Sequence, residues 1–522
     1  MMIKKYIAII FLIILIINVI GISGCLEQTE NNENINYNTI TIGVGSDEYN
    51  AQYPCGEFLN GKILTINSNI YNGLVEFDNQ FGIIPSLAEN WHNPNNTTWR
   101  LNLRKDVKFH NGYNFTAEDV KYTIDKIKED KKNPTYKHFL IVKEINIIDN
   151  FTVDLVTEKP DPLLLNYLPY VFMISKQYYE ETSNNPPVGT GPYKFCEYTE
   201  NQSIELERFN SYWGGRPKYM NVIFRFYSDY ENRLKALSSN ESDILYYVAF
   251  DDIERLCKKS YIQNVSGFFP TVYYLMFDFR KNDSCCFDED NPVSNVRVRK
   301  AIYHAIDIET IIEDVLYGYA KPISQFVYSD IFGFNPNIER LTYDLSIARQ
   351  YMKDAGYEQG FEIDLDCFDM AYRKNVSLMV SDQLSKINIT VNVNILPKSE
   401  FIQKVYINRN SSFYYFGWDF DFGDACEIFT SILHTINEEY GFGFANYGYY
   451  SNPEIDNITK NIIYEMNSKK RLKLMHDGFE IAMNDIACIP LFILKYTFLM
   501  NDRVLLNPIV CFQQVDRWVD MR

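Results

Sequence analysis

Segments with the two-residue period of a β-strand alternate with segments of helical period along most of this chain of 522 residues. Residues 39–44 and 98–103 alternate as strands do, and a helical pattern at 374–386 lies between the strand-like segments 361–368 and 389–396. Because an order of strand, helix and strand is typical of open α/β sheets, we predict a mixed α/β fold with several sheets. Further strands are predicted at 151–156, 203–208 and 222–227, further helices after Thr116 and at 296–316, 345–355 and 469–487, and a buried apolar segment at 489–494.

Length and charge restrict the kind of protein. A chain this long exceeds what one hydrophobic core can hold, so at least two domains are expected. Its net charge of −18 argues against binding to nucleic acid, because phosphates require basic surfaces. No repeat stands out at the periods typical of solenoids or propellers.

The N-terminus has the pattern of a secretory signal. Lys4 and Lys5 precede an apolar run at 6–23, and small residues lead from there into Cys25. A cysteine in this position resembles a lipobox, in which the thiol takes a diacylglycerol and becomes the new N-terminus. The alternative is an uncleaved membrane anchor, since the run approaches spanning length. Both put the body of the chain outside the membrane, on the outer face.

Motifs of catalysis and of metal binding are missing from the sequence. It contains no HExxH, GxSxG, GxxxxGKS/T or GxGxxG, no local pair of histidines and no CxxC. We therefore predict no metal and no cofactor, and a protein that is not an enzyme. A glycosidase pair of carboxylates stays open, because its members need only meet in space. Nine cysteines remain after Cys25, so at least one is free, and their pairing is not assigned.

Four groups of segments occur in an order that resembles one known family. They are NIYNGLVEFD at 69–78 with LAENW, LRKDVKFHNG and TAEDV at 87–120, PVGTGPY at 187–193, NVRVRKAIYHAID and GYAKP at 295–322, and FGWDFDFGD at 416–424. Together they resemble the family 5 extracellular solute-binding proteins, the peptide- and nickel-binding components of ABC importers. The resemblance runs from about residue 39 to the C-terminus.

The resemblance implies a bilobal fold like that of the periplasmic binding proteins of type II, with an extra α/β domain inserted in the first lobe. The lobes would be joined by a hinge and would close over the ligand. The expected parts are a signal peptide at 1–24, a flexible tether at 25–38, lobe 1 at 39–65, 186–275 and 486–522, the inserted domain at 66–185, and lobe 2 at 276–485.

The resemblance also implies an amine-binding carboxylate. In dipeptide-binding relatives an Asp shortly after a Gly-Trp pair takes the α-amino group of the peptide, and the matching residue here is Asp421, after Trp418. A carboxylate screened from water would form a charge-assisted hydrogen bond to an ammonium. The alternative is that Asp419, Asp421 and Asp424 form a solvated acidic loop or bind calcium. Trp418 would close over the ligand or fill the core, and Asp424 is a further ligand candidate.

Arg373 follows the strand-like segment 361–368 and matches the place where relatives carry an Arg for the carboxylate of the ligand. This agrees with the rule that ligands of open α/β sheets bind beyond the carboxyl ends of the strands. The alternative is a surface charge at the start of a helix. Tyr372 and Tyr71 are weaker candidates for ligand contact.

Taken together, these features predict an extracytoplasmic solute-binding lipoprotein, a monomer that captures peptides for the permease and ATPase subunits of an ABC importer. One alternative keeps the fold but changes the ligand to a nickel chelate, an oligosaccharide or another solute. Two others are a secreted hydrolase and a sensor or adhesin without an importer.

Overall fold

The computed structural model describes residues 38–45, 61–133, 135–182, 186–246, 248–281, 291–506, 515 and 519–521. The predicted signal peptide, Cys25 and the tether up to residue 37 lie outside the described residues. Residues Ile40–Arg522 form one unit by their contacts. Among the helices described, none combines the length and the apolar character that crossing a membrane requires.

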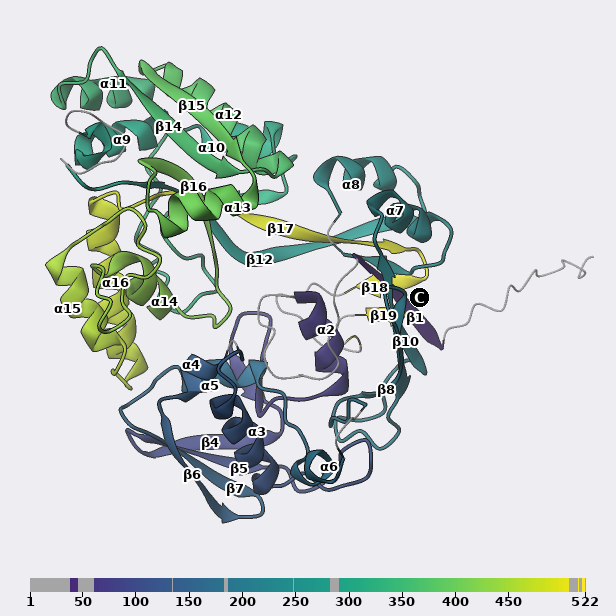
Figure 1. Cartoon of the computed structure of the whole chain (residues 1–522). Coiled ribbons are helices and arrows are strands. Elements are labelled where there is room, and N and C mark those ends of the chain that lie inside the picture. Colours follow the sequence, from purple (N-terminus) through teal and green to yellow (C-terminus); the bar gives the residue numbers. More distant parts are fainter. Residues whose placement is uncertain are drawn as a thin grey trace, which may run out of the picture. The chain divides into compact units, whose positions relative to one another are not determined.

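An eleven-stranded mixed sheet connects elements from both halves of the unit (Figure 1). Its strands follow the order β15-β14-β16-β12-β17-β11-β1-β10-β9-β8, and β13 pairs with β17 beside this path. β14 lies parallel to both β15 and β16, and β1 lies parallel to β11. The bounds are β1 Thr39–Gly45, β8 Tyr193–Thr199, β9 Ser203–Arg208, β10 Asn221–Tyr227, β11 Ile244–Leu245, β12 Ile262–Phe277, β13 Ala320–Pro322, β14 Phe361–Phe368, β15 Ile389–Leu396, β16 Phe413–Asp419 and β17 Ile489–Asn501. The predicted mixed α/β class is confirmed.

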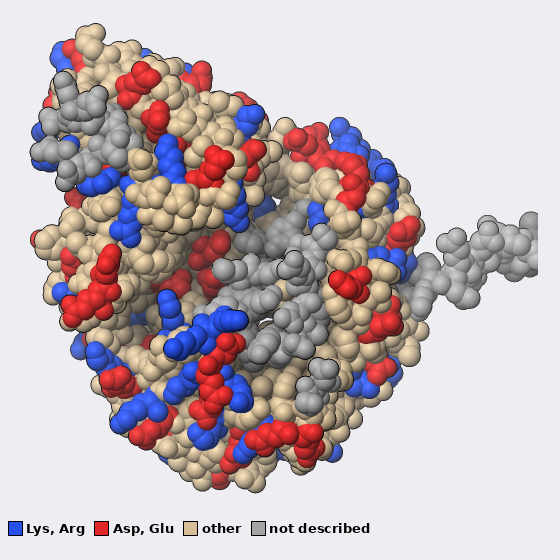
Figure 2. All heavy atoms as spheres, viewed as in Figure 1, with Lys and Arg blue, Asp and Glu red and all other residues tan. Residues whose placement is uncertain are grey.

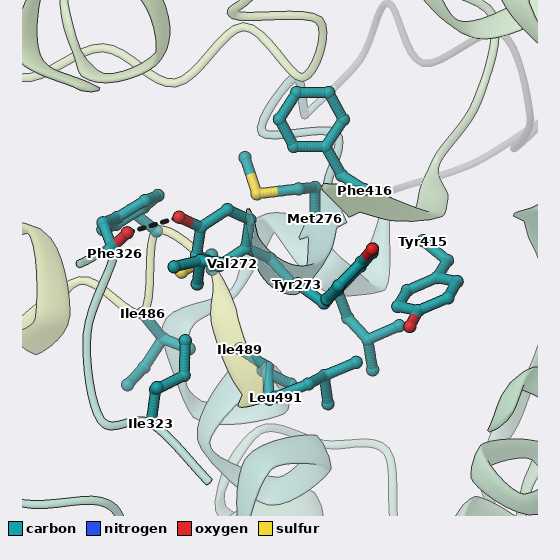
Figure 3. Close-up of a cluster of buried hydrophobic side chains, with 14 of the residues drawn as sticks. Val272, Tyr273, Met276, Ile323, Phe326, Tyr415, Phe416, Ile486, Ile489 and Leu491 are labelled. Carbon is teal, nitrogen blue, oxygen red and sulfur yellow. Dashed lines mark hydrogen bonds between the residues drawn. The ribbon is translucent and has the colours of Figure 1, made fainter. Parts of the chain in front are cut away.

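Two long antiparallel strands, β12 and β17, belong to two hydrophobic cores at once. The second part of β12 and residues 489–494 of β17 lie in the core around β14 and β16, part of which Figure 3 shows. Phe498 and Met500 of β17 lie instead in the core around β1, β9 and β10. The register of β12 against β17 shifts between Phe268 and Val272, where the pairing of β12 with β16 begins at Thr271. The two strands therefore join the two cores through backbone hydrogen bonds.

Helices cover the part of the sheet formed by β14, β15 and β16. The predicted helix at 296–316 is in fact two helices, α9 (Val296–Ala305) and α10 (Ile308–Asp314). Asp307 causes the break, because its side chain accepts a hydrogen bond from the N–H of Thr310 (3.2 Å) and caps α10. The other helices of this part are α11 Leu345–Asp354, α12 Ala371–Ser385, α13 Lys398–Phe401, α14 Cys426–Ile428, α15 Pro453–Ile462 and α16 Ser468–Asn484. A 3-10 helix spans Pro292–Ser294, and π-helices span Ile402–Ile407 and Phe429–Leu433.

A separate four-stranded antiparallel sheet, in the order β4-β5-β7-β6, has its own core. The helix predicted after Thr116 is α3 (Ala117–Glu129), and the N–H of Thr116 donates to the Asp119 carboxylate (2.8 Å) as expected of a capping box. The strands of this sheet are β4 Ala88–Asn95, β5 Thr98–Leu103, β6 Val142–Asp149 and β7 Thr152–Thr157, and a separate two-stranded sheet pairs β2 Val75–Phe77 with β3 Ile83–Pro85. Other described elements are α2 Gly61–Ile70, α4 Tyr136–Phe139, α5 Leu164–Tyr167, a turn at Leu168–Tyr170, α6 Lys176–Glu181, α7 Tyr230–Ser238, α8 Phe250–Cys257, β18 Val504–Leu506 and β19 Val519–Met521.

The turn at 187–193 packs directly on the end of α2. A Cβ at Gly189 would lie 2.0 Å from the carbonyl oxygen of Ile70, and one at Gly191 would lie 2.6 Å from the carbonyl oxygen of Asn69. The N–H of Gly191 donates to the carbonyl of Ile70 (2.9 Å). Only glycine allows this approach of two backbones, at the point where the chain leaves the β4–β7 sheet for β8.

Candidate functional site

The carboxyl ends of two neighbouring strands bring most of the predicted ligand residues together. β14 pairs with β16 in parallel through Asp366 and Tyr414, so both strands end at the same edge of the sheet. After β14 the chain enters α12, which carries Tyr372 and Arg373. After β16 it continues through the acidic segment 419–425 into α14. Edges of this kind are where open α/β sheets bind ligands.

Arg373 is buried, with 7% of its surface exposed, and its guanidinium lies among aromatic rings. Its Cζ is 4.0 Å from the ring centre of Phe368, 5.0 Å from that of Tyr415 and 5.1 Å from that of Tyr273. Its Nε has no hydrogen-bond partner in the described part of the chain, and no carboxylate there forms an ion pair with it. Arg373 is therefore not a surface charge, and an anionic group from outside the chain would complement it.

Gly417 leaves the space that the guanidinium occupies. A Cβ at this position would lie 3.1 Å from Nη2 of Arg373 and 3.0 Å from Cε1 of Tyr273. The hydroxyl of Tyr273 is also 3.0 Å from that of Tyr372, which is half-buried at the start of α12. Glycine before Trp418 thus lets Arg373 lie against β16.

Beyond the end of β16, the carboxylates of Asp419, Asp421 and Glu427 lie close enough for their charges to interact. Burial and the charge of Asp419 raise the pKa of Asp421 to about 7. Burial also raises the pKa of Asp419, although a hydrogen bond from Thr271 and the charge of Arg373 oppose the shift. Burial, followed by the charge of Asp421, raises the pKa of Glu427 well above its usual range. Figure 2 shows acidic side chains inside a hollow on this face of the unit.

Trp418 is half-buried at the same edge, and its ring centre is 6.1 Å from that of Phe444, which is 58% exposed. The indole N–H of Trp418 is directed to Glu427 and opposes the rise in the pKa of that carboxyl. The site therefore has an aromatic wall beside its carboxylates. Within the described residues, no three His, Cys, Asp or Glu side chains are arranged to hold a metal ion.

The acidic segment is held by residues of α4, of α5 and of the short helix Leu168–Tyr170 that follows it. The ring of Phe422 lies among those of His138, Tyr167 and Tyr170, at centre distances of 4.9, 4.8 and 5.6 Å. The Asn166 side chain donates to the carbonyl of Phe422 (2.8 Å), and the Tyr170 hydroxyl donates to the carbonyl of Asp421. We call His138, Asn166, Tyr167 and Tyr170 the aromatic socket. It fixes the backbone that carries Asp421.

Two of the predicted ligand residues have other partners. Asp424 is buried and forms a bidentate ion pair with Arg471, with N–O distances of 2.6 and 2.9 Å. It also accepts a hydrogen bond from the N–H of Cys426 (2.8 Å). Tyr71 is 1% exposed in the core around β1, where its ring centre is 6.0 Å from that of Phe172. The structure thus brings Arg373, Tyr372, Trp418 and Asp421 together, and it places Asp424 and Tyr71 among structural contacts.

Sequence reasoning missed Glu427, Thr271, Tyr273 and the aromatic socket. Glu427 had a usable signal, because it lies six positions after Asp421 at the start of a helix that follows the acidic segment. Thr271 and Tyr273 come from β12, and the socket residues precede Phe422 by more than 250 residues. Nothing local in the sequence relates these residues to Asp421.

Comparison with known proteins agrees with this arrangement. The family model of the bacterial extracellular solute-binding proteins, family 5 Middle, matches residues 82–439. The dipeptide-binding protein of Escherichia coli (strain K12) is 25% identical over 454 residues, which cover 80% of this chain and 82% of that protein. Other curated relatives are named heme-, glutathione- and nickel-binding proteins.

Solved structures share the fold. The structure of HbpA2 from Haemophilus parasuis matches with a TM-score of 0.80 at 20% identity, over 93% of this chain and 100% of that one. The ABC transporter-associated periplasmic binding protein DppA from Helicobacter pylori, in complex with the peptide STSA, matches with a TM-score of 0.70 at 23% identity, over 92% and 98%. The predicted fold like that of the periplasmic binding proteins is confirmed. Because the family model matches well over half of the chain, this protein belongs to the bacterial extracellular solute-binding proteins, family 5.

Proposed function

We propose that the protein captures a peptide outside the membrane and delivers it to the permease of an ABC importer. The proposal rests on one observation: Arg373 is buried, no carboxylate among the described residues forms an ion pair with it, and it lies at the same sheet edge as the carboxylates of Asp419 and Asp421. A peptide carries the complementary groups at its two ends, an ammonium and a carboxylate. Asp421 would receive the ammonium and Arg373 the carboxylate, each through charge-assisted hydrogen bonds.

Tyr372 and Trp418 would complete the ligand contacts, Tyr372 through its hydroxyl and Trp418 through its ring. Lobe 1, with the inserted domain, would close over lobe 2, because contacts to the ligand from both sides favour the closed form. The closed protein would dock on the permease, and ATP hydrolysis by the importer would reopen it. The protein would bind its ligand without reacting with it.

The anchor in this proposal is a diacylglycerol on Cys25, after removal of residues 1–24. The intact mass of the protein purified from membranes would show the lipid, and a Cys25→Ser variant would lose it. A different result would identify an uncleaved anchor. In that case both the unmodified protein and the Cys25→Ser variant would keep residues 1–24, carry no lipid and stay in the membrane fraction.

Native mass spectrometry of the protein as purified, followed by calorimetric titration with Ala-Ala and Ala-Ala-Ala, tests the ligand class. We expect a bound peptide, and an affinity that falls by about tenfold to a hundredfold in Arg373→Met, since a charge-assisted hydrogen bond is lost. Arg297→Met makes the same chemical change at an exposed position and should leave the affinity unchanged. A bound nickel chelate or oligosaccharide would replace the peptide in the proposal, and turnover of the peptides would indicate a hydrolase.

A further inference from the structure

The hairpin between β6 and β7 has a tip of two residues, Asn150 and Phe151. Asp149 pairs with Thr152 on the opposite strand, and the Asp149 carboxylate accepts a hydrogen bond from the N–H of Phe151 (2.7 Å). The N–H of Ala117 donates to the carbonyl of Asn150 (2.9 Å). The backbone of the tip is thus held in place, while the side chain of Asn150 is exposed and makes no hydrogen bond to another described residue.

Asn150, Phe151 and Thr152 form the sequon N-x-S/T, which is the acceptor sequence for N-linked glycans in secreted proteins. The hydroxyl of Thr152 also makes no hydrogen bond within the part of the chain that the structure describes. Both polar side chains of the sequon are therefore available to an enzyme that reads it, at an exposed turn of the folded protein.

Two other sequons of the chain show what is different here. Asn457 lies on α15, where the hydroxyl of Thr459 is buried and donates to the carbonyl of Ile455 (2.8 Å). In the turn after β4, the hydroxyl of Thr97 is bonded to the carboxamide oxygen of Asn95 (3.0 Å). A sequon by itself is a weak signal, and the hairpin of β6 and β7 adds an exposed tip on which both groups are unbonded.

A hollow of about 670 Å³ opens beside this tip, and the three sequon residues line it together with Glu89, Asn102 and Lys105. Its size lies within the range of small-molecule sites, about 300–1,000 Å³. The lining offers amide, ammonium and carboxylate groups to the hydroxyls of a sugar. The half-buried ring of Phe151, whose centre is 5.9 Å from the Nζ of Lys105, adds an apolar face on which a sugar ring packs. The hollow thus suits a polar ring with many hydroxyl groups, and the acceptor side chain itself lines it.

We propose that Asn150 carries an N-linked glycan whose first sugars lie in this hollow. In the transfer, Nδ2 of Asn150 forms a bond to the anomeric carbon of a lipid-linked oligosaccharide. The bond from that carbon to the phosphate oxygen of the lipid carrier breaks, and the leaving lipid phosphate takes up the charge that balances the proton lost from Nδ2. The glycan requires only the extracellular location of the family and not a particular ligand, so its absence would leave the peptide-binding proposal standing.

Peptide mapping by mass spectrometry of the full-length protein, purified from its own cells, tests the attachment. We expect a glycan on the tryptic peptide that contains Asn150, and its loss in both Asn150→Gln and Thr152→Val. Thr152→Ser keeps the hydroxyl and should keep the glycan, and Asn457 should be unmodified in every form. An unmodified Asn150 in the natural protein would overturn the proposal, and so would a glycan that persists on Asn150 in folded Thr152→Val.

Labelling of lysines tests whether the sugars occupy the hollow. Lys105 lines the hollow, whereas Lys108 is also exposed but does not line it. An amine-reactive ester should label Lys105 several-fold more slowly in the glycosylated protein than in Asn150→Gln, while Lys108 reacts equally in both. Equal rates at Lys105 in a protein that is glycosylated at Asn150 would mean that the sugars extend into solvent, which contradicts their proposed place.

Discussion

Replacing Arg471 by methionine tests whether Asp424 is part of the fold or of the ligand site. Both side chains are 4% exposed, and the guanidinium holds the carboxylate through two bonds of 2.6 and 2.9 Å. Methionine fills most of the volume of the arginine stem, but it leaves the carboxylate with the N–H of Cys426 as its remaining described donor. Removing one partner of a buried ion pair costs about 3–5 kcal/mol, because the other charge stays buried without compensation. We expect that loss in the free energy of unfolding.

The loss is large compared with a total stability of roughly 5–15 kcal/mol for a typical domain, so urea unfolding followed by tryptophan fluorescence will resolve it. The double variant Arg471→Met/Asp424→Asn removes both charges and should recover most of the lost stability. Lys473→Met, on the same helix but 74% exposed, should change stability by less than about 0.5 kcal/mol. The reasoning is refuted if Arg471→Met is as stable as the Lys473 variant, or if the double variant is no more stable than Arg471→Met. If the recovered double variant binds peptide normally, Asp424 is structural.

Three further outcomes follow from the site. Phe422→Ala removes the ring that fills the aromatic socket and should lower the free energy of unfolding by about 3–5 kcal/mol. It should also weaken peptide binding, because the backbone of Asp421 loses its support. Unchanged affinity by calorimetry would show that the socket does not position Asp421. Gly417→Ala should weaken peptide binding, since the added methyl group would press on Arg373 and Tyr273. The circular dichroism spectrum should stay the same. Full affinity would mean that the guanidinium does not contact the ligand. The pKa of Asp421 is about 7 in the folded protein and about 4 in an unfolded chain. Between about pH 4 and pH 7 the folded form therefore holds a proton that the unfolded form has released. The free energy of unfolding should therefore fall from about pH 4 to pH 7, and urea midpoints at pH 4.5 and 7.5 should differ less in Asp421→Asn than in the unmodified protein.

Strands with a clean alternation were predictable to the residue. The segments 98–103, 203–208, 361–368 and 389–396 coincide with β5, β9, β14 and β15. Buried and less buried residues alternate in β9, whereas three consecutive residues of β14, 365–367, are all buried. The long strand β12 was missed. Pro270 interrupts its pattern at the place where its register against β17 shifts, and proline inside a strand weakens the sequence signal.

The predicted helix boundaries were wrong where a polar capping residue interrupts an apolar pattern. The apolar positions of α9 and α10 continue one stripe across Ile306 and Asp307, so periodicity alone predicts one helix. The side chain of Asp307 starts a new helix within that stripe. Periodicity reports which residues face the core, and it does not report whether the backbone stays helical between them.

The candidate site was predictable only where the family motif carries it. Asp421, Trp418 and Arg373 came from the resemblance, and the parallel pairing of β14 with β16 explains why two motifs about 45 residues apart meet. The socket could not be predicted, because its contact with Phe422 depends on how residues 138–170 pack against a segment that follows them by more than 250 positions.

The strand that joins the two cores also orients both kinds of charge at the site. Thr271 donates to the Asp419 carboxylate and Tyr273 packs on the Arg373 guanidinium, and these residues are two apart on β12, so they face the same side of the sheet. A slip of one residue in the pairing of β12 with β16 would turn both side chains away together. The pairing with β16 begins at Thr271, next to the register shift against β17. The geometry of the charged site and the geometry of the connection between the cores are therefore set by the same few residues of β12.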